Sequence, residues 1–291
     1  MDVKRGVYFL AHHGVIDLVI AFLNSFRRFN PTLSLCLIPF NEEVSEISRL
    51  REEYDFLVYN GPEYLIHCDE ISRSFFSTPC GQFRKLAAWE GLFDEFIYVD
   101  IDTVVQHPFD FCFDYLELYG FVTSHSNLGG IRKWVWRDSI YSADSGLSEA
   151  QIAYSANTGF IVSRRGLLSR NVVSQRVTKG AQLAEHMELQ CTEQPFLNYL
   201  IVTSGVPYTS LLSISRQTGS HDIPLERWAG KSLGKIDSGK IIREEGDSEV
   251  LIVHWAGEWQ SGRHERNPLW RYYRDLGISE TCPEHSSVDV S

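Results

Sequence analysis

Two aspartates that follow an apolar segment are the side chains of this sequence best suited to hold a metal ion. Residues 96–99 are apolar and lead directly into Asp100 and Asp102, which Ile101 separates. If the strand continues through them, both carboxylates point to the same side, because side chains alternate along a strand. Two neighbouring carboxylates repel each other, which is unfavourable near a core. A divalent cation bound between them removes this repulsion, because hard cations prefer oxygen ligands. We therefore interpret the pair as a candidate metal site, with solvated turn aspartates as the alternative.

A histidine stands in the same position after a second apolar segment. Residues 250–253 are apolar, and His254 follows them. An imidazole can complete a coordination sphere that carboxylates begin. Taken alone, His254 is more simply a strand-end residue that hydrogen-bonds to the backbone. Taken together with Asp100 and Asp102, it is interpreted as the third metal ligand.

An asparagine interrupts a strand-like stretch further along the chain. Asn157 and Gly159 both break the apolar pattern there. An amide offers a donor and acceptors to hydroxyl groups, so Asn157 is a candidate for substrate binding. A β-bulge with a turn-forming asparagine is the alternative.

A helix start supplies two more polar candidates. Thr192 is expected to cap a helix that carries Pro195 in its first turn. Glu193 and Gln194 would then lie at the positive end of the helix, where they could face a substrate. A cap and first turn without further function is the alternative.

The segments that must position these residues predict an α/β protein. Strand, helix, strand, helix and strand patterns follow one another at residues 6–10, 17–29, 33–40, 42–54 and 56–59. This alternation indicates a parallel sheet covered by helices.

The rest of the chain is expected to extend this sheet. A helix is predicted at residues 82–93, and strands are predicted at 95–105, 154–163 and 250–255. Open α/β sheets bind their ligands at the carboxyl ends of the strands, which is where the acidic pair lies.

Composition and charge disfavour several classes of protein. The chain has 27 basic and 38 acidic residues and a net charge of −11, which disfavours a nucleic-acid-binding protein. The longest nearly apolar run, residues 14–23, contains Asp17 and is shorter than the roughly 20 residues of a membrane helix. No secretory signal opens the sequence, and its six scattered cysteines form no CxxC pair. We therefore expect a cytoplasmic protein without an integral membrane segment, either free or peripheral to a membrane.

The order of these motifs resembles the GT-A-fold glycosyltransferases, in particular the retaining, metal-dependent group that includes glycogenin and bacterial galactosyl- and glucosyltransferases. The resemblance covers about residues 1–260, and four motifs in this order are more specific than any one of them. They are Arg84-Lys85-Leu86 with Tyr98-Val99-Asp100-Ile101-Asp102, then Asn157-Thr158-Gly159, then Glu193-Gln194 with Leu197-Asn198, and then His254-Trp255-Ala256-Gly257.

This resemblance implies a GT-A-like (Rossmann-like) fold of the α/β class, with a mixed, mostly parallel sheet flanked by helices. It implies one domain over residues 1–277, with a nucleotide-binding half at 1–105 and an acceptor half at 106–277. Residues 278–291 are expected to form a loose tail.

The resemblance also implies the transfer of a sugar from a nucleotide-sugar donor, a UDP-sugar, to an acceptor hydroxyl with retention of configuration. The acceptor would be a glycan, a lipid-linked sugar, a small molecule or a protein. The family's Mn²⁺ or Mg²⁺ would be held by Asp100, Asp102 and His254, and its catalytic positions match Asn157, Glu193 and Gln194. The donor would contact Ala11, His12, Gly14, Arg84, Lys85, Asp100, Ile101 and Gly257.

Two departures from the family pattern bear on activity. The family continues its histidine motif to a lysine that grips the diphosphate, but here no lysine follows His254 at that place, and Arg263 is the candidate substitute. The family also often has an aspartate where this chain has Glu193. The missing lysine leaves a catalytically inactive nucleotide-sugar-binding protein as one alternative. A nucleotidyltransferase of related fold is another, although residues 12–14 do not resemble its Gly-rich basic loop.

Two long stretches without clear periodicity, residues 124–151 and 213–249, are expected to be binding loops or lids, or else plain surface loops. Tryptophans near them could stack on sugar faces or a nucleobase, with ordinary packing as the alternative. These tryptophans are Trp134, Trp136, Trp228 and Trp259.

Overall fold

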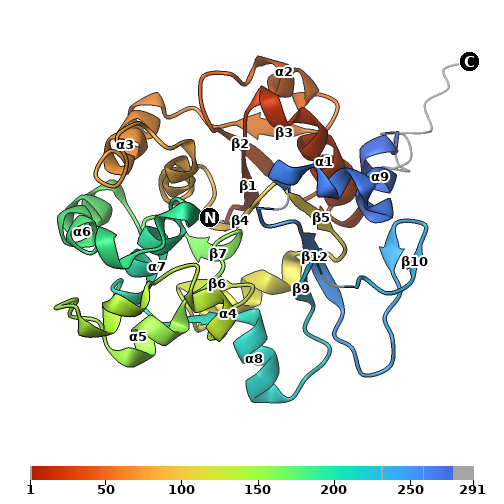
Figure 1. Cartoon of the computed structure of the whole chain (residues 1–291). Helices are drawn as coiled ribbons and strands as arrows, with labels where there is room; N and C mark the ends of the chain where they lie inside the picture. The colour runs from red at the N-terminus through yellow and green to blue at the C-terminus, as the bar shows by residue number, and fades with distance from the viewer. Residues whose placement is uncertain (1, 231, 258, 278–291) are drawn as a thin grey trace, which may run out of the picture.

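The computed structural model describes residues 2–230, 232–257 and 259–277 (Figure 1). The tail expected at residues 278–291 lies outside the described residues, and so does the side chain of Trp259.

A seven-stranded sheet forms the centre of the molecule, in the order β3-β2-β1-β4-β7-β6-β8. Its pairings are parallel except for those of β7, which runs antiparallel to both β4 and β6. The prediction of a mixed, mostly parallel sheet is therefore confirmed. Its strands are β1 (Arg5–Ala11), β2 (Leu35–Pro39), β3 (Phe56–Val58), β4 (Glu95–Val99), β6 (Phe121–Thr123), β7 (Phe160–Arg164) and β8 (Tyr208–Ser210).

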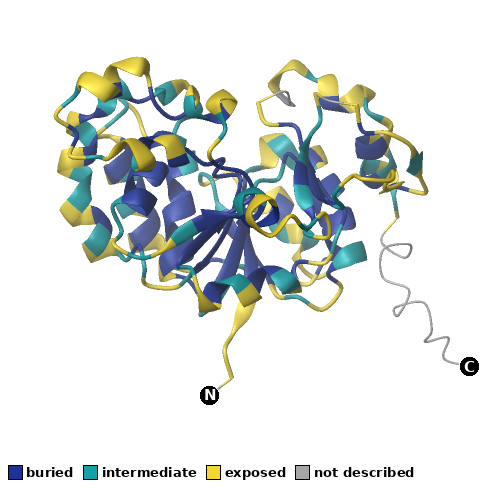
Figure 2. Cartoon of the chain, turned by 90° about the horizontal axis from the view of Figure 1, so that it is seen from below, coloured by how far each residue is buried: buried dark blue, intermediate teal, exposed yellow. Residues whose placement is uncertain are grey.

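Alternating side chains of the central strands enter two separate cores. In β4, Phe96 and Tyr98 join one apolar cluster, whereas Ile97 and Val99 join the other. Both faces of the sheet are therefore covered, as expected for a mostly parallel sheet. Figure 2 shows the buried strands between layers of helices whose outer surfaces are exposed.

The first of these clusters packs under α3 (Pro62–Ser72), α6 (Arg170–Gln182) and α7 (Gln194–Val202). The second packs under α1 (Ile16–Phe29). The remaining α-helices are α2 (Ser45–Ser48), α4 (Gly129–Arg132), α5 (Glu149–Tyr154), α8 (Leu211–Thr218) and α9 (Pro268–Asp275). The 3₁₀ segments span His13–Val15, Arg49–Arg51, Gly81–Glu90, Asp110–Glu117, Asp138–Ser142, Ala184–His186, Leu189–Cys191, Trp259–Ser261 and Arg263–Arg266.

A second sheet of three strands lies beside the first, in the order β5-β12-β9. β5 (Thr103–Val105) runs antiparallel to β12 (Val250–His254), and β9 (Leu225–Trp228) runs parallel to β12. α1 and α9 pack together over this sheet (Figure 1). There the Asn24 side chain donates to the backbone oxygen of Tyr273. A separate hairpin joins β10 (Ile236–Asp237) to β11 (Lys240–Ile241).

The single strand predicted at residues 95–105 is in fact two strands in two sheets. β4 ends at Val99, residues 100–102 turn, and β5 leaves to pair with β12. The alternation argument for Asp100 and Asp102 is therefore wrong, because neither lies in a strand. The turn brings their carboxylates together instead.

The strand predicted at residues 154–163 is correct only in its second half. Tyr154 ends α5, and β7 begins at Phe160. Between them the backbone of Ala156 is bonded on both sides by the Asn198 side chain, with distances of 2.6 Å and 2.9 Å. Since these backbone groups are satisfied by a side chain, they do not join a sheet.

Four other helix and loop predictions need correction. The helix predicted at residues 42–54 is reduced to α2 and one 3₁₀ turn, and the helix predicted at 82–93 is a 3₁₀ helix over Gly81–Glu90. The stretch 124–151 contains α4 and the start of α5. The stretch 213–249 contains most of α8 together with β9, β10 and β11. In the described part of the chain, no helix combines the length and the apolar character that crossing a membrane requires.

Candidate functional site

A cavity of about 740 Å³ opens at the carboxyl ends of β1, β4, β9 and β12. It therefore lies where ligands of open α/β sheets bind. Most of the candidate residues line it, whereas Gly14, Arg84 and Arg263 are not among its described lining residues. The candidates that line the cavity are Ala11, His12, Lys85, Asp100, Ile101, Asp102, Asn157, Glu193, Gln194, His254 and Gly257.

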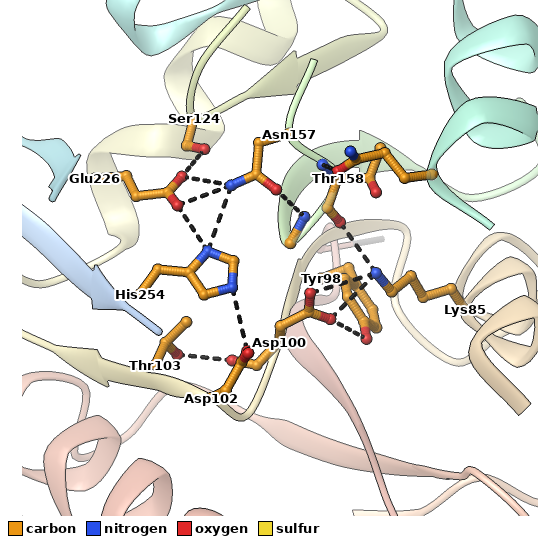
Figure 3. Close-up of polar contacts among 12 residues, drawn as sticks. Lys85, Tyr98, Asp100, Asp102, Thr103, Ser124, Asn157, Thr158, Glu226 and His254 are labelled. Atoms are coloured by element: carbon orange, nitrogen blue, oxygen red, sulfur yellow. Dashed lines mark hydrogen bonds and ion pairs between the residues drawn. The ribbon is translucent and has the colours of Figure 1, made fainter. Parts of the chain in front are cut away.

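The three predicted metal ligands converge in this cavity (Figure 3). Asp100, Asp102 and His254 each offer one ligand atom, and these atoms lie within 4.8 Å of one another. His254 Nε2 is 3.2 Å from Asp102 Oδ1. Two carboxylates and an imidazole form a donor set that suits a divalent cation, so these residues fit the metal that the resemblance implies.

Backbone bonds hold the turn that carries the two aspartates. The Asp100 N–H donates to the Gly159 oxygen at 2.8 Å, and the Trp255 N–H donates to the Asp102 oxygen at 2.9 Å. The Thr103 hydroxyl donates to the backbone oxygen of Asp100 at 2.7 Å. The turn after β4 is thus tied to the ends of β7 and β12, which explains why the ligands meet.

A glutamate that sequence reasoning missed supports the histidine from behind. His254 Nδ1 lies 2.7 Å from Glu226 Oε1, and the Glu226 side chain is fully buried. Glu226 belongs to β9, inside a stretch expected to be loop. Its acidic side chain in a polar, charged segment carries no signal of burial, so no local pattern could have identified it.

Burial and charge act in opposite directions on this pair. Burial favours the neutral forms, but the charge and the hydrogen bond of His254, together with the nearby His125, hold the pKa of Glu226 well below its usual range. Burial likewise favours neutral His254, but Asp102 and Glu226 raise the pKa of its imidazole well above the usual value.

Lys85 is the second charged centre of the site. Its Nζ lies 2.5 Å from Glu193 Oε1 and 3.1 Å from Asp100 Oδ1, above the ring of Tyr98. Burial alone lowers the pKa of Lys85, but Asp100 and Glu193 outweigh it and raise the pKa. Burial is also the main reason that the pKa of Asp100 is raised, and Lys85 opposes it.

Arg84, the neighbour of Lys85, is engaged elsewhere. Its guanidinium binds Asp69 at 2.7 Å and 2.9 Å and Glu42 at 3.0 Å. The structure therefore joins Lys85, but not Arg84, to the cavity.

Glu193 is fixed by hydrogen bonds from two sides. Oε1 accepts from Lys85, and Oε2 accepts from the Thr192 hydroxyl at 2.7 Å. The prediction that Thr192 caps α7 is wrong, because its positive φ of 53° takes it out of the cap conformation and Glu193 occupies that position. The prediction of Pro195 in the first turn is confirmed.

The two amide candidates are also oriented by hydrogen bonds. Gln194 accepts from the Thr158 N–H at 3.2 Å and donates to the Trp134 oxygen at 3.1 Å. Asn157 donates to both oxygens of Glu226, at 2.8 Å and 2.9 Å. Asn157 therefore contributes to the support of His254 as well as to the cavity wall.

Aromatic rings lie on several sides of the cavity. His12 packs against Phe40 with ring centroids 4.9 Å apart, and Trp228 stacks on His254 at 6.3 Å. Trp134 lines the cavity and is 44% exposed, whereas Trp136 is buried in the core. Trp134 and Trp228 could therefore stack on a ligand, and Trp136 is a packing residue.

No protein-family model matches the chain, and no curated protein sequence matches it either. Solved structures do match it. The glycosyltransferase GlyE of Streptococcus pneumoniae superposes with a TM-score of 0.52 at 15% identity over 97% of this chain. The chain spans only 63% of GlyE.

Two other matches are of similar length to this chain. The galactosyltransferase LgtC, solved in complex with donor and acceptor sugar analogs, superposes with a TM-score of 0.56 at 15% identity and with 97% of each chain covered. Mouse xyloside xylosyltransferase 1 superposes with a TM-score of 0.51 at 14% identity, covering 87% of this chain and 97% of its own. At these identities the comparison establishes the fold, and this chain has the GT-A glycosyltransferase fold.

Proposed function

We propose that this chain is a metal-dependent glycosyltransferase that moves a sugar from a nucleotide-sugar donor, a UDP-sugar, to an acceptor hydroxyl with retention of configuration. One observation carries the proposal: Asp100, Asp102 and His254 converge in the large cavity at the carboxyl ends of the strands. The GT-A fold of the chain adds support.

In this proposal Asp100, Asp102 and His254 hold Mn²⁺ or Mg²⁺. When bound, the cation stabilises the negative charge that builds up on the departing nucleotide. It also explains how a chain of net charge −11 binds a polyanion, because a bound cation reverses the local field.

The remaining donor contacts follow from the lining of the cavity. Ala11 and His12, with the neighbouring Gly14, form the nucleotide end of the site after β1. Ile101 and Gly257 also line the cavity and are assigned to the donor.

The sugar end of the site is assigned to three polar residues. The reacting sugar becomes oxocarbenium-like, and its hydroxyls need oriented partners. Asn157, Glu193 and Gln194 all line the cavity and are held by hydrogen bonds. We assign Glu193 or Gln194 to the neighbourhood of the reacting carbon.

The lining comes from both parts of the chain, which supports one domain over residues 1–277, with a nucleotide-binding half at 1–105 and an acceptor half at 106–277. The acceptor in this proposal is a hydroxyl of a glycan, a lipid-linked sugar, a small molecule or a protein.

We also propose a cytoplasmic location, which fits the scattered cysteines, because thiols stay reduced there.

A catalytically inactive nucleotide-sugar-binding protein is the second candidate. Among the described residues that line the cavity, Lys85 is the only lysine or arginine, and it is already paired with Glu193 and Asp100. The described lining therefore offers no unpaired lysine or arginine to bind a diphosphate.

A thermal-shift screen of nucleotide sugars with and without Mn²⁺ tests the proposal. A ligand that binds only the folded state raises the free energy of unfolding of the protein. The increase is about 2.7 kcal/mol when the ligand concentration is about a hundred times its Kd. We expect a UDP-sugar to raise Tm only with Mn²⁺, and this effect to be lost in Asp102→Asn but kept in the matched control Asp237→Asn, an exposed aspartate of β10. The absence of any cation-dependent shift in the native chain would refute the proposal.

Slow hydrolysis of the donor in the presence of Mn²⁺ then separates the two candidates. An enzyme releases free sugar and nucleotide, whereas an inactive binding protein shows the thermal shift without hydrolysis. NMR of the anomeric proton in the product reports whether configuration is retained.

A further inference from the structure

Glu226 is a buried carboxylate that polar groups surround inside the protein (Figure 3). Its oxygens accept hydrogen bonds from the Ser124 hydroxyl, the Asn157 amide and His254. An isolated buried carboxylate is unfavourable, and these hydrogen bonds compensate the cost of burying Glu226.

The contact with His254 defines which ring nitrogen carries a proton. Both Glu226 oxygens accept from the Asn157 amide, whose nitrogen can only donate, and one of them also accepts from the Ser124 hydroxyl, so the carboxylate acts as an acceptor. Because Nδ1 lies 2.7 Å from Glu226 Oε1, Nδ1 must carry the hydrogen. Nε2 is then the ring nitrogen that faces Asp102, 3.2 Å away.

Asn157 does not compete with Glu226 for the hydrogen on His254 Nδ1. Its Nδ2 lies 3.4 Å from His254 Nδ1, but both atoms are donors, so the pair is not hydrogen-bonded. The amide donates to Glu226 and accepts from the Gly159 N–H at 3.0 Å. Asn157 and Ser124 therefore hold Glu226 in the position that meets the imidazole.

We propose that Glu226 is a positioning residue that orients His254 and presents Nε2, as the Nδ1–H tautomer, to a divalent cation shared with Asp100 and Asp102. The inference rests on the cation site of the proposed function. A carboxylate behind a metal-binding histidine fixes the ring and makes it more basic, and removing such a partner typically weakens metal binding about 10–100-fold. Glu226 itself does not line the cavity.

Calorimetric titration of Mn²⁺ tests the proposal with matched variants. We expect Glu226→Gln, which keeps the shape and removes the charge, to weaken Mn²⁺ binding about 10–100-fold. The control is Glu95→Gln, which removes an ion-paired glutamate only 12% exposed at the far end of β4. Ser124→Ala, which removes a donor to Glu226 without touching His254, should weaken binding less than Glu226→Gln.

The outcomes separate this inference from the proposed function. If the native chain binds no Mn²⁺, the proposed function and this inference both fail. If the native chain binds Mn²⁺ and folded Glu226→Gln binds it equally well, Glu226 is not a positioning residue and the proposed function stands.

A measurement on the native chain keeps the inference testable if Glu226→Gln does not fold. Nitrogen-15 NMR in saturating Mg²⁺, with the His254 signals assigned by their loss in His254→Gln, reports the protonation of each ring nitrogen. We expect a protonated Nδ1 and an unprotonated Nε2. A protonated Nε2 with a bare Nδ1 would overturn the assignment.

Discussion

Gly159 faces His254 so closely that a Cβ atom at Gly159 would lie 2.6 Å from His254 Cε1. The same atom would lie 2.8 Å from Asp100 Oδ2. Both distances are shorter than real carbon contacts, so only glycine lets the end of β7 approach two of the three candidate ligands.

Gly159→Ala should therefore displace His254 or Asp100 and weaken cation binding. We expect a Mn²⁺ affinity at least about 10-fold lower, as for other changes that misplace ligands, and a lower Tm. Gly130→Ala is the control, because nothing lies within 4 Å of a Cβ there. Calorimetry that finds native Mn²⁺ affinity in Gly159→Ala would show that the ligands do not depend on this close approach.

Lys85→Met should destabilise the cation-free protein, because Lys85 is the buried counter-charge of Asp100 and Glu193. Breaking a buried pair from one side typically costs about 3–5 kcal/mol. We expect urea unfolding in EDTA to show a loss of this order, partly restored in the double variant Lys85→Met with Glu193→Gln. The exposed Lys179→Met is the control, with a change within about 0.5 kcal/mol. If the stability loss of the double variant equals the sum of the losses of the two single variants, Lys85 and Glu193 are not coupled.

Glu193→Gln tests whether the charge of Glu193 serves catalysis. The amide can keep both contacts, since its oxygen can accept from Lys85 and its NH₂ can donate to the Thr192 hydroxyl. Folding should therefore survive while the charge is lost. We expect turnover to fall about 10²-fold or more, the usual effect of removing one electrostatic contact to a transition state. Unchanged turnover removes Glu193 from any catalytic role.

Cys191 lines the cavity, and burial raises the pKa of its thiol from 9.0 to about 11. The thiolate is the reactive form, and a higher pKa leaves less of it at a given pH. Alkylation of Cys191 at pH 8 should therefore be about 100-fold slower than that of an unperturbed thiol, and should keep rising with pH until about 11.

Peptide mass spectrometry after iodoacetamide treatment measures this rate separately for each cysteine. UDP with Mn²⁺ should protect Cys191 if the nucleotide fills the cavity, and Cys36, which is fully buried, should stay unmodified. A rate that levels off near pH 9 would show that the thiol is not desolvated.

Local patterns were enough to predict several elements of the fold. The helix at residues 17–29 and the strand at 250–255 closely match α1 and β12, because each has a strong apolar pattern of its own. Predictions failed where a distant partner decides the backbone. Ala156 bonds to the Asn198 side chain instead of a neighbouring strand, and Thr192 has a positive φ.

The sequence by itself determined the class of the fold and the identity of the candidate cation ligands, because apolar runs that end in Asp100, Asp102 and His254 can be recognised from neighbouring residues alone. Only the tertiary structure decided how those ligands meet. It splits the segment 95–105 between two sheets, and it brings the Glu226 carboxylate behind His254 from 28 residues away. The physical reason is that burial and charge pairing depend on which distant segments pack together. A single stretch of sequence does not show which segments will pack against it.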